Sequence, residues 1–373
     1  MARRGRCLGS ALVWWSCDAS LRELCPNPHY EVSTQRRYEW HSVDLGEQWS
    51  HASFPIDGLR SEIRMLEIGG PTPWAESVYG MAARVDNIVQ RNHFARTGQM
   101  DVGKGASREF YGVDQNDLEG LPFAPLAGQP SLGTTYQRHG AQLDGIADES
   151  YRVVFTSHVL EHFLDPLGAL REWHRVLEPG GVLILVVPWA PAVSYDAHRD
   201  PSTMQALLHL SALNASFNDD VLRSRAEAFL KSMDGKPNFN PDIFTLCDGD
   251  DAKARDDVAT AAATRNCRVD ENHAHWHVWD FDLLREAVEG CLGYTMLMML
   301  LQEPWHQIIA GKKPFAPRQV VEAARNDDTW ANATVARVHR SNRTYDLIFH
   351  DDGTYVAAPE RLIRCSGRGV FRR

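Results

Sequence analysis

The chain has 373 residues, of which 43% are hydrophobic and 24% are charged, and this composition excludes a disordered or fibrous protein. The formal net charge of −10 disfavours a nucleic-acid partner, because phosphate backbones attract basic surfaces. No run of about 18 apolar residues occurs, so no segment is expected to span a membrane. At this length the sequence predicts two domains or one elaborated domain.

Residues 1–55 are expected to form a partly disordered leader. They begin with MARRGR and continue into a short apolar stretch. This start leaves secretion or organelle targeting open beside a cytoplasmic location, which we favour. The seven cysteines are scattered, and no two have the C-x-x-C spacing. The sequence therefore predicts a reducing compartment, with neither a disulfide framework nor a zinc knuckle.

Residues 56–313 alternate short apolar runs with helical patterns, which is typical of an α/β fold with a parallel sheet between helices. A helix is expected after Asp165, with Pro166 at its first position, and a second at residues 282–291. The strands expected in this part are residues 63–68, 81–85, 109–113, 151–156, 182–187, 294–301 and 306–310.

Two segments interrupt this alternation. Residues 122–146 are rich in Gly, Pro, Gln and Ser and lack periodicity, so they are predicted to form an inserted surface loop. Residues 200–272 are longer and partly helical, and we expect them to form a lid on the sheet. Residues 312–317 contain Lys-Lys-Pro and a further proline, which indicates a linker.

Residues 318–365 have the pattern of a small all-β barrel. Short strands are expected at residues 319–325, 331–339, 345–349 and 355–363. The sequence Asp-Asp-Gly at 351–353 predicts a hairpin turn between the last two of them.

Acidic side chains are expected at the ends of three successive strands of the α/β part, where parallel strands present a ligand-binding edge. Glu67 precedes two glycines, Asp86 is expected to end the second strand, and Asp114 the third. The glycine turn lacks the G-x-G-x-x-G spacing, which disfavours pyrophosphate. Carboxylates so arranged favour a nucleoside that carries hydroxyls, an amine and a cationic centre. Each carboxylate taken alone is more typical of a solvated turn, and only the three together indicate a nucleoside site.

The sharpest motif is DESYRVVFTSHVLEH at residues 148–162, which is followed by RVLEPGG at 175–181. These motifs resemble the class I methyltransferases that use S-adenosylmethionine, over about residues 60–190 and more weakly 273–311. The resemblance implies a Rossmann-like, mostly parallel seven-stranded sheet with helices on both faces. It also implies methyl transfer from S-adenosylmethionine to a small-molecule or protein acceptor. Pro71 and Arg152 stand where the family usually has Gly and Asp, which leaves open a noncatalytic adaptor with a decayed ligand site.

The resemblance also assigns the cofactor-binding residues. Glu67, Gly69 and Gly70 are assigned to the methionine part of the cofactor, and Asp86 to its ribose. Asp114 and Asn116 are assigned to the adenine, and Ser157 to the methyl-transfer site.

His158 and His162 are the candidate catalytic residues, since with Glu161 they form the ionisable cluster expected near the transferred methyl group. A neutral imidazole can take a proton from an attacking atom near pH 7. The alternative is that these side chains cap a helix and fill the core.

The histidines at 273, 275 and 277 alternate, and on a strand they would share one face and could ligate a metal. No Cys or clear fourth ligand lies nearby. We therefore expect no metal ion and interpret this segment as the return from the lid to the next helix.

The C-terminal strands resemble the Tudor-like group of small barrels. Members that bind methylated side chains use an aromatic cage with an acid, in which a methylammonium gains cation–π attraction. The resemblance implies a peptide partner bound through Trp330, Phe349 and Tyr355 with Asp351. The alternative is that these aromatic side chains belong to the core of the barrel.

Overall fold

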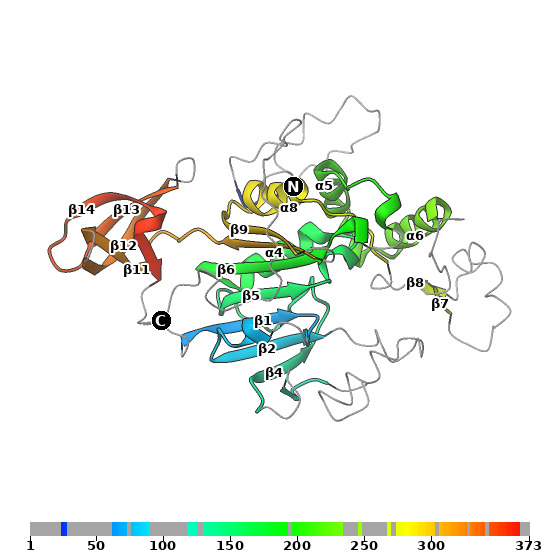
Figure 1. The fold of residues 1–373 in the computed structure, drawn as a ribbon, viewed down its shortest axis with the longest axis horizontal. Helices are drawn as coiled ribbons and strands as arrows, with labels where there is room; N and C mark the ends of the chain where they lie inside the picture. Colours follow the sequence, from blue (N-terminus) through cyan, green and yellow to red (C-terminus); the bar gives the residue numbers. More distant parts are fainter. Residues whose placement is uncertain are drawn as a thin grey trace, which may run out of the picture.

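The computed structural model describes residues 24–27, 62–72, 76–89, 118–124, 130–192, 196–233, 245–247, 267–269, 274–302, 306–326, 329–339 and 343–365. The largest element of this part is an eight-stranded sheet with helices packed against it (Figure 1). Its strands in spatial order are β3 (Pro122–Phe123), β4 (Gly133–Gln137), β2 (Arg84–Val89), β1 (Arg64–Ile68), β5 (Tyr151–Ser157), β6 (Leu177–Pro188), β10 (His306–Lys312) and β9 (Thr295–Gln302).

Five neighbouring strands, from β4 to β6, run parallel, whereas β3 pairs antiparallel with β4, β10 with β6, and β9 with β10. The α/β class and the mostly parallel sheet agree with the sequence prediction, but the sheet has eight strands among the described residues instead of seven. The chain extends from β1 to one side through β2 and returns to β5 on the other side. Ligands of open α/β sheets bind beyond the carboxyl ends of the strands at such a switch point.

The prediction for the second strand is displaced. Residues 81–85 are apolar at their start, but Met81 and Ala82 are buried in a turn, and strand pairing begins where Arg84 lies opposite Arg64. The strand then continues to Val89. Burial of the turn explains the error, because an apolar run looks the same in a turn against the core and in a strand.

The predicted surface loop 122–146 is also wrong. It contains β3 and β4, and β4 pairs in parallel with β2. Leu143 is fully buried, and the Trp173 indole donates a hydrogen bond of 2.8 Å to the carbonyl of Gly140. The expected strand at 109–113 lies outside the described residues, and among the described strands β4 lies beside β2.

The helices of the α/β part are α2 (Glu76–Tyr79), α4 (Pro166–Val176), α5 (Met204–Ala212), α6 (Asp219–Met233) and α8 (Phe281–Arg285), which continues as a π-helix to Cys291. The α4 helix begins as predicted, since Asp165 accepts a hydrogen bond of 2.7 Å from the Gly168 amide. Among the described residues, no helix combines the length and the hydropathy needed to cross a bilayer.

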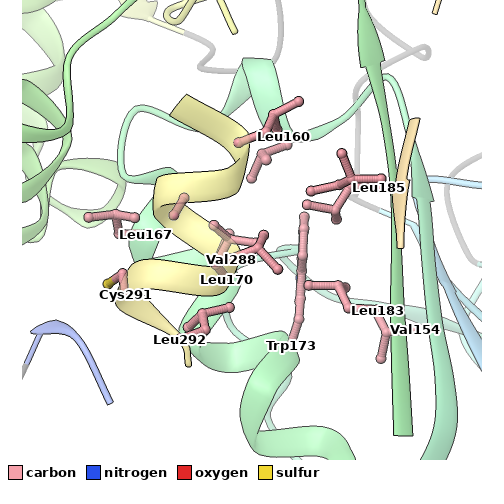
Figure 2. Packing of buried hydrophobic residues seen from close by; sticks show 14 of the residues in the cluster. Val154, Leu160, Leu167, Leu170, Trp173, Leu183, Leu185, Val288, Cys291 and Leu292 are labelled. Carbon is pink, nitrogen blue, oxygen red and sulfur yellow. The ribbon is translucent and has the colours of Figure 1, made fainter. Parts of the chain in front are cut away.

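Two apolar layers hold the sheet between its helices. On one face, Trp173 and Leu170 of α4 pack with Val288 against Val154 and Leu183 of the strands (Figure 2). On the other face, Val78 and Tyr79 of α2 pack in a cluster with residues of β1, β2, β5, β6 and β10. Helices therefore cover both faces, as expected.

The segment predicted as a lid, 200–272, contains α5, α6 and the short hairpin of β7 (Thr245–Cys247) and β8 (Cys267–Val269). Phe229 of α6 packs against Trp276, and both belong to a small core with Leu164, which follows β5. This core fixes the helical part of the segment above the loop that follows β5.

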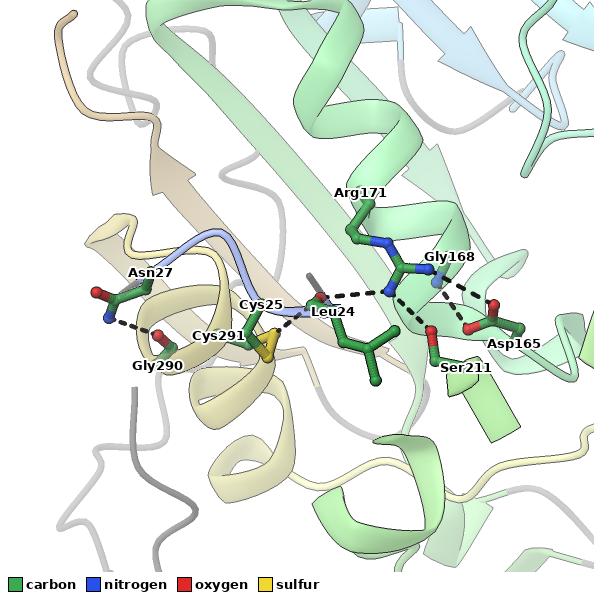
Figure 3. Close-up of a disulfide and its surroundings, with 9 residues drawn as sticks. All are labelled: Leu24, Cys25, Asn27, Asp165, Gly168, Arg171, Ser211, Gly290 and Cys291. Atoms are coloured by element: carbon green, nitrogen blue, oxygen red, sulfur yellow. Dashed lines mark hydrogen bonds and ion pairs between the residues drawn. A yellow bond between two sulfur atoms is a disulfide. The ribbon is translucent and has the colours of Figure 1, made fainter. Parts of the chain in front are cut away.

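A disulfide joins Cys25 to Cys291 at the end of the π-helix (Figure 3). The Asn27 side chain donates a hydrogen bond of 2.7 Å to the Gly290 carbonyl, and Arg171 donates one of 3.3 Å to the carbonyl of Leu24. The sequence indicated no disulfide framework, and this single disulfide departs from the scattered, reduced cysteines that were expected. Four residues of the expected leader are attached to the sheet domain, and its other residues lie outside the described part.

The C-terminal unit is a five-stranded antiparallel sheet in the order β14 (Tyr355–Pro359), β13 (Thr344–Phe349), β12 (Thr329–His339), β11 (Val320–Asn326) and β15 (Ile363–Cys365), with its own apolar core. The predicted fourth strand is two strands, because a short 3₁₀ turn follows Pro359 and sends the chain back beside β11. Its likeness to a Tudor-like barrel stays a prediction. Lys313 in the expected linker is buried and donates hydrogen bonds of 2.7 Å to the carbonyls of His174 and Leu177.

Candidate active site

The glycine turn after β1 lies at the switch point of the sheet. Gly69 has φ of +82°, and a Cβ atom there would lie 2.4 Å from Cγ2 of Val159, so the turns after β1 and β5 are in close contact. At Gly70 a Cβ atom would lie 2.1 Å from Cδ of Glu67. The Gly70 amide donates a hydrogen bond of 3.1 Å to the Asn87 side chain on β2. Only glycine fits both positions without displacing a neighbour.

Glu67 is fully buried on β1 beneath this turn. The Tyr79 hydroxyl lies 2.9 Å from both of its carboxylate oxygens and donates to them. Burial raises the pKa of Glu67 to about 7, and this effect exceeds the opposing effect of hydrogen bonds from Thr72 and Tyr79.

Glu67 should make folding stability pH-dependent. Its pKa is raised in the folded state, so the folded chain binds more protons than the unfolded chain between the ordinary pKa of 4.5 and about 7. The free energy of unfolding should therefore fall as pH rises through this window, by on the order of 3 kcal/mol. Denaturant unfolding at pH 4.5, 6 and 8 measures the free energy of unfolding of the wild type and of Glu67→Gln. Equal pH slopes for the two proteins would contradict the prediction.

Asp86 is not at a strand tip. It lies in the middle of β2, is fully buried, and accepts hydrogen bonds from Arg84 (2.9 Å), the Thr134 amide (2.9 Å) and the Tyr151 hydroxyl (3.0 Å). Arg64 lies 3.6 Å away. Arg64 and Tyr151 are the first residues of β1 and β5, so the Asp86 side chain contacts the starts of these strands, at the side of the sheet opposite to the switch-point edge. The displaced start of β2 explains the error. Asp114 and Asn116 lie outside the described residues.

Ser157 ends β5, and His158 follows it with φ of 54°, a left-handed conformation that is strained for histidine. His158 Nε2 lies 2.7 Å from Nδ1 of His306. His306 pairs with Pro188 at the end of β6, so both histidines lie at the same edge of the sheet as the glycine turn. Burial lowers the pKa of His158 to about 4, with a further contribution from His306, and burial also lowers the pKa of His306. Both imidazoles are therefore neutral at pH 7.

A second ionisable cluster adjoins this pair. Glu161 is 1% exposed, and its Oε1 lies 3.6 Å from Nδ1 of His158, 3.8 Å from Nε2 of His162 and 4.0 Å from Nε2 of His275. Asp196 lies 2.5 Å from Nδ1 of His275. Burial raises the pKa of Glu161 to about 7, more than the charge of His275 lowers it.

The structure thus gathers Gly69, Gly70, Ser157, His158 and His162 at one edge and separates Asp86 from them. Sequence reasoning did not single out Asp196 or His306, which join the cluster from elements distant along the chain. For His306 a signal existed, because it begins an expected strand. To place His306 at this edge, however, one must also know that its strand runs antiparallel to β6.

The three aromatic residues expected to form a cage in the C-terminal sheet have other neighbours. The guanidinium of Arg364 lies 4.2 Å from the ring centre of Trp330, and that of Arg325 lies 4.4 Å from the ring centre of Phe349. The Tyr355 hydroxyl donates a hydrogen bond of 2.6 Å to a carboxylate on β13. Cations of the same chain therefore cover two of the three rings.

Comparison with known proteins connects this geometry to a family. Residues 101–185 match the family model described as Methyltransferase domain. A stretch of 102 residues is 33% identical to the ubiquinone biosynthesis O-methyltransferase of Ruegeria pomeroyi, over 24% of this chain and 41% of that protein. The chain thus spans less than half the length of this curated relative.

The solved structures that match part of this chain include two methyltransferases. One is the SAM-dependent methyltransferase from Aquifex aeolicus, with 9% identity and a TM-score of 0.32 over 68% of this chain and 84% of that chain. The other is the S-adenosylmethionine-dependent methyltransferase from Mesorhizobium loti, with 11% identity and a TM-score of 0.32 over 70% and 94%. The family match falls within the sheet domain, from the segment after β2 into β6, and indicates that this part of the chain is similar to a methyltransferase domain.

Proposed function

We propose that the chain transfers a methyl group from S-adenosylmethionine to a hydroxyl-bearing small-molecule or protein acceptor, and that His158 removes the acceptor proton. The observation that carries this proposal is the His158–His306 pair, 2.7 Å apart at the switch-point edge. The residue after His158 contacts the glycine turn, so the pair and the turn adjoin one another.

The residues present fit the cofactor in the part of the site that the structure describes. The close contacts at Gly69 and Gly70 leave bare backbone at the end of β1, where a Cβ would meet another side chain. Gly69, Gly70 and Ser157 are the residues proposed to hold S-adenosylmethionine, and Glu67 supports the turn from below. The bound cofactor would supply a methyl group on a positively charged sulfur atom.

His158 is suited to proton removal by its geometry. His306 shares one proton with it through the Nε2–Nδ1 contact, which fixes the orientation of the His158 ring. Nδ1 of His158 lies on the side of Glu161. A proton that His158 takes from an acceptor hydroxyl therefore enters a cluster of imidazoles and a carboxylate, and these groups can share it.

His158→Gln should lower kcat for methyl transfer by roughly 10² to 10⁴, the usual contribution of a general base, and leave the Kd for S-adenosylmethionine nearly unchanged. Transfer of labelled methyl groups into acceptor extracts measures kcat, and titration calorimetry measures Kd. His198→Gln, at an exposed histidine, is the matched control. If His158→Gln kept full activity the base assignment would fail, and if the wild type bound no cofactor the methyltransferase proposal would fail.

We infer for the C-terminal sheet only that a peptide partner would have to displace Arg364 from Trp330 and Arg325 from Phe349. Arg325 is also paired with Asp351 and Asp352. This arrangement favours a structural role for the rings over the expected cage and lends no support to the adaptor alternative. Binding of trimethyllysine peptides that is abolished by Trp330→Ala would reverse this conclusion.

A further inference from the structure

Glu161 is a buried carboxylate that accepts no hydrogen bond from any other residue in the described part of the chain. It is 1% exposed. A buried carboxylate is normally paired, hydrogen-bonded or bound to a metal, because the loss of hydration is costly. Its nearest polar neighbours are imidazole nitrogens at 3.6 to 4.0 Å, which is too far for a hydrogen bond and leaves space for an atom between them.

Three ligand atoms converge there. The Oε1 of Glu161, a ring nitrogen of His162 and a ring nitrogen of His275 all lie within 4.8 Å of one another, and the two imidazole rings are nearly perpendicular, at 84°. Around an ion with bonds of about 2.1 Å, tetrahedral ligand atoms lie about 3.4 Å apart. The two imidazole nitrogens would have to approach Glu161 by about half an ångström, and the separation within the whole group would have to shrink by at most about 1.4 Å.

The surroundings hold these ligands in place. Asp196 binds Nδ1 of His275 at 2.5 Å and thereby directs Nε2 toward Glu161, which is the arrangement that orients histidine ligands in many metal sites. Arg199 donates to Asp196 (2.8 Å) and to the carbonyl of His275 (2.5 Å). The Trp276 amide donates to the carbonyl of Glu161 at 2.9 Å, so the segment that follows the lid is joined to the turn after β5 at this point.

From this geometry we propose that Glu161, His162 and His275 bind a divalent first-row transition-metal ion. Two imidazoles and one carboxylate suit zinc or iron, whereas magnesium and calcium prefer oxygen ligands. Three protein ligands leave at least one position open for water or an acceptor oxygen. This proposal departs from the sequence prediction of no metal. It places His275 in a site with Glu161 and His162, and not with the histidines at 273 and 277.

His277 turns to other partners, since its ring nitrogens lie 3.3 Å from the Ser202 hydroxyl and 3.2 Å from the Leu164 carbonyl. The role of the ion rests on the proposed function. Beside His158, a bound cation would make an acceptor hydroxyl more acidic and would assist proton removal.

Titration of the chelator-treated full chain with Zn²⁺, without cofactor, tests the site by calorimetry. We expect one equivalent to bind with a micromolar or lower Kd, and Mg²⁺ not to compete. His275→Ala and Glu161→Gln should each weaken binding by at least a hundredfold, and Asp196→Asn by 10- to 100-fold. His198→Ala, at an exposed histidine two residues from Asp196, should change Kd by less than about twofold.

The melting temperature of each variant establishes that it is folded, and Asp196→Asn serves if Glu161→Gln does not fold. Absence of Zn²⁺ binding to the folded wild type, or equal affinity in the His275→Ala variant, would overturn the proposal. If methyl transfer persists in the presence of the chelator, the metal ion has no role in the reaction and the proposed function still stands. If the chain binds Zn²⁺ but no S-adenosylmethionine, the metal site stands and the proposed function fails.

Discussion

Asp86→Ala is expected to lower the free energy of unfolding by about 3 kcal/mol, because buried donors left without an acceptor cost about 1 to 3 kcal/mol each. The Thr134 amide and the Tyr151 hydroxyl lose their acceptor, whereas the half-exposed Arg84 and Arg64 can regain water. Cofactor affinity should stay unchanged, since Asp86 lies away from the switch-point edge.

Chemical denaturation and calorimetry with S-adenosylmethionine measure the two effects of Asp86→Ala separately. The matched control is Glu119→Ala, which removes a more exposed carboxylate paired with Arg138 at 2.8 Å and should cost less than about 1 kcal/mol. A stable Asp86→Ala variant with tenfold weaker cofactor binding would instead restore the role at the ribose that the sequence suggested.

Gly69→Ala is expected to weaken S-adenosylmethionine binding at least tenfold and to lower the melting temperature. The added Cβ would lie 2.4 Å from Cγ2 of Val159, so the turns after β1 and β5 must separate. Gly145→Ala is a close control, because Gly145 has nearly the same φ, +81° against +82°, and no heavy atom lies within 4 Å of its added Cβ. The cost of positive φ, about 1 kcal/mol, is common to both variants.

A second substitution separates the contact from the backbone strain. In the double variant Gly69→Ala with Val159→Ala, Cγ2 is absent, so much of the lost affinity should return. Calorimetry on the two single variants, the double variant and Gly145→Ala measures this coupling. Equal losses of affinity in Gly69→Ala and Gly145→Ala would show that the turn does not border the cofactor.

The elements that were predicted well have strong local signals. Asp165 and Pro166 mark the start of α4, and the apolar runs of β5 and β6 have no competing helical pattern. Each signal acts within a few residues, so the sequence alone specifies the element.

The elements that were missed depend on contacts distant in sequence. β4 has a weak local pattern, and its pairing with β2 determines it as a strand. Asp86 was misplaced because the apolar start of its segment, Met81, lies three residues before Arg84, the first residue that pairs. The cluster around Glu161 requires His275, which is more than a hundred residues away, and no periodicity encodes such an encounter.

The disulfide between Cys25 and Cys291 turns most of the sheet domain into a covalent ring, because the two cysteines are 266 positions apart. All strands of the large sheet except β9 and β10 lie on this ring, and the C-terminal sheet lies on the tail that follows it. A single backbone cut inside the ring opens it without releasing any fragment, whereas a single cut between β10 and β11 frees the C-terminal sheet. Under oxidising conditions the two units therefore differ in what one proteolytic event does to them: the first is nicked and remains one covalent molecule, and the second is detached.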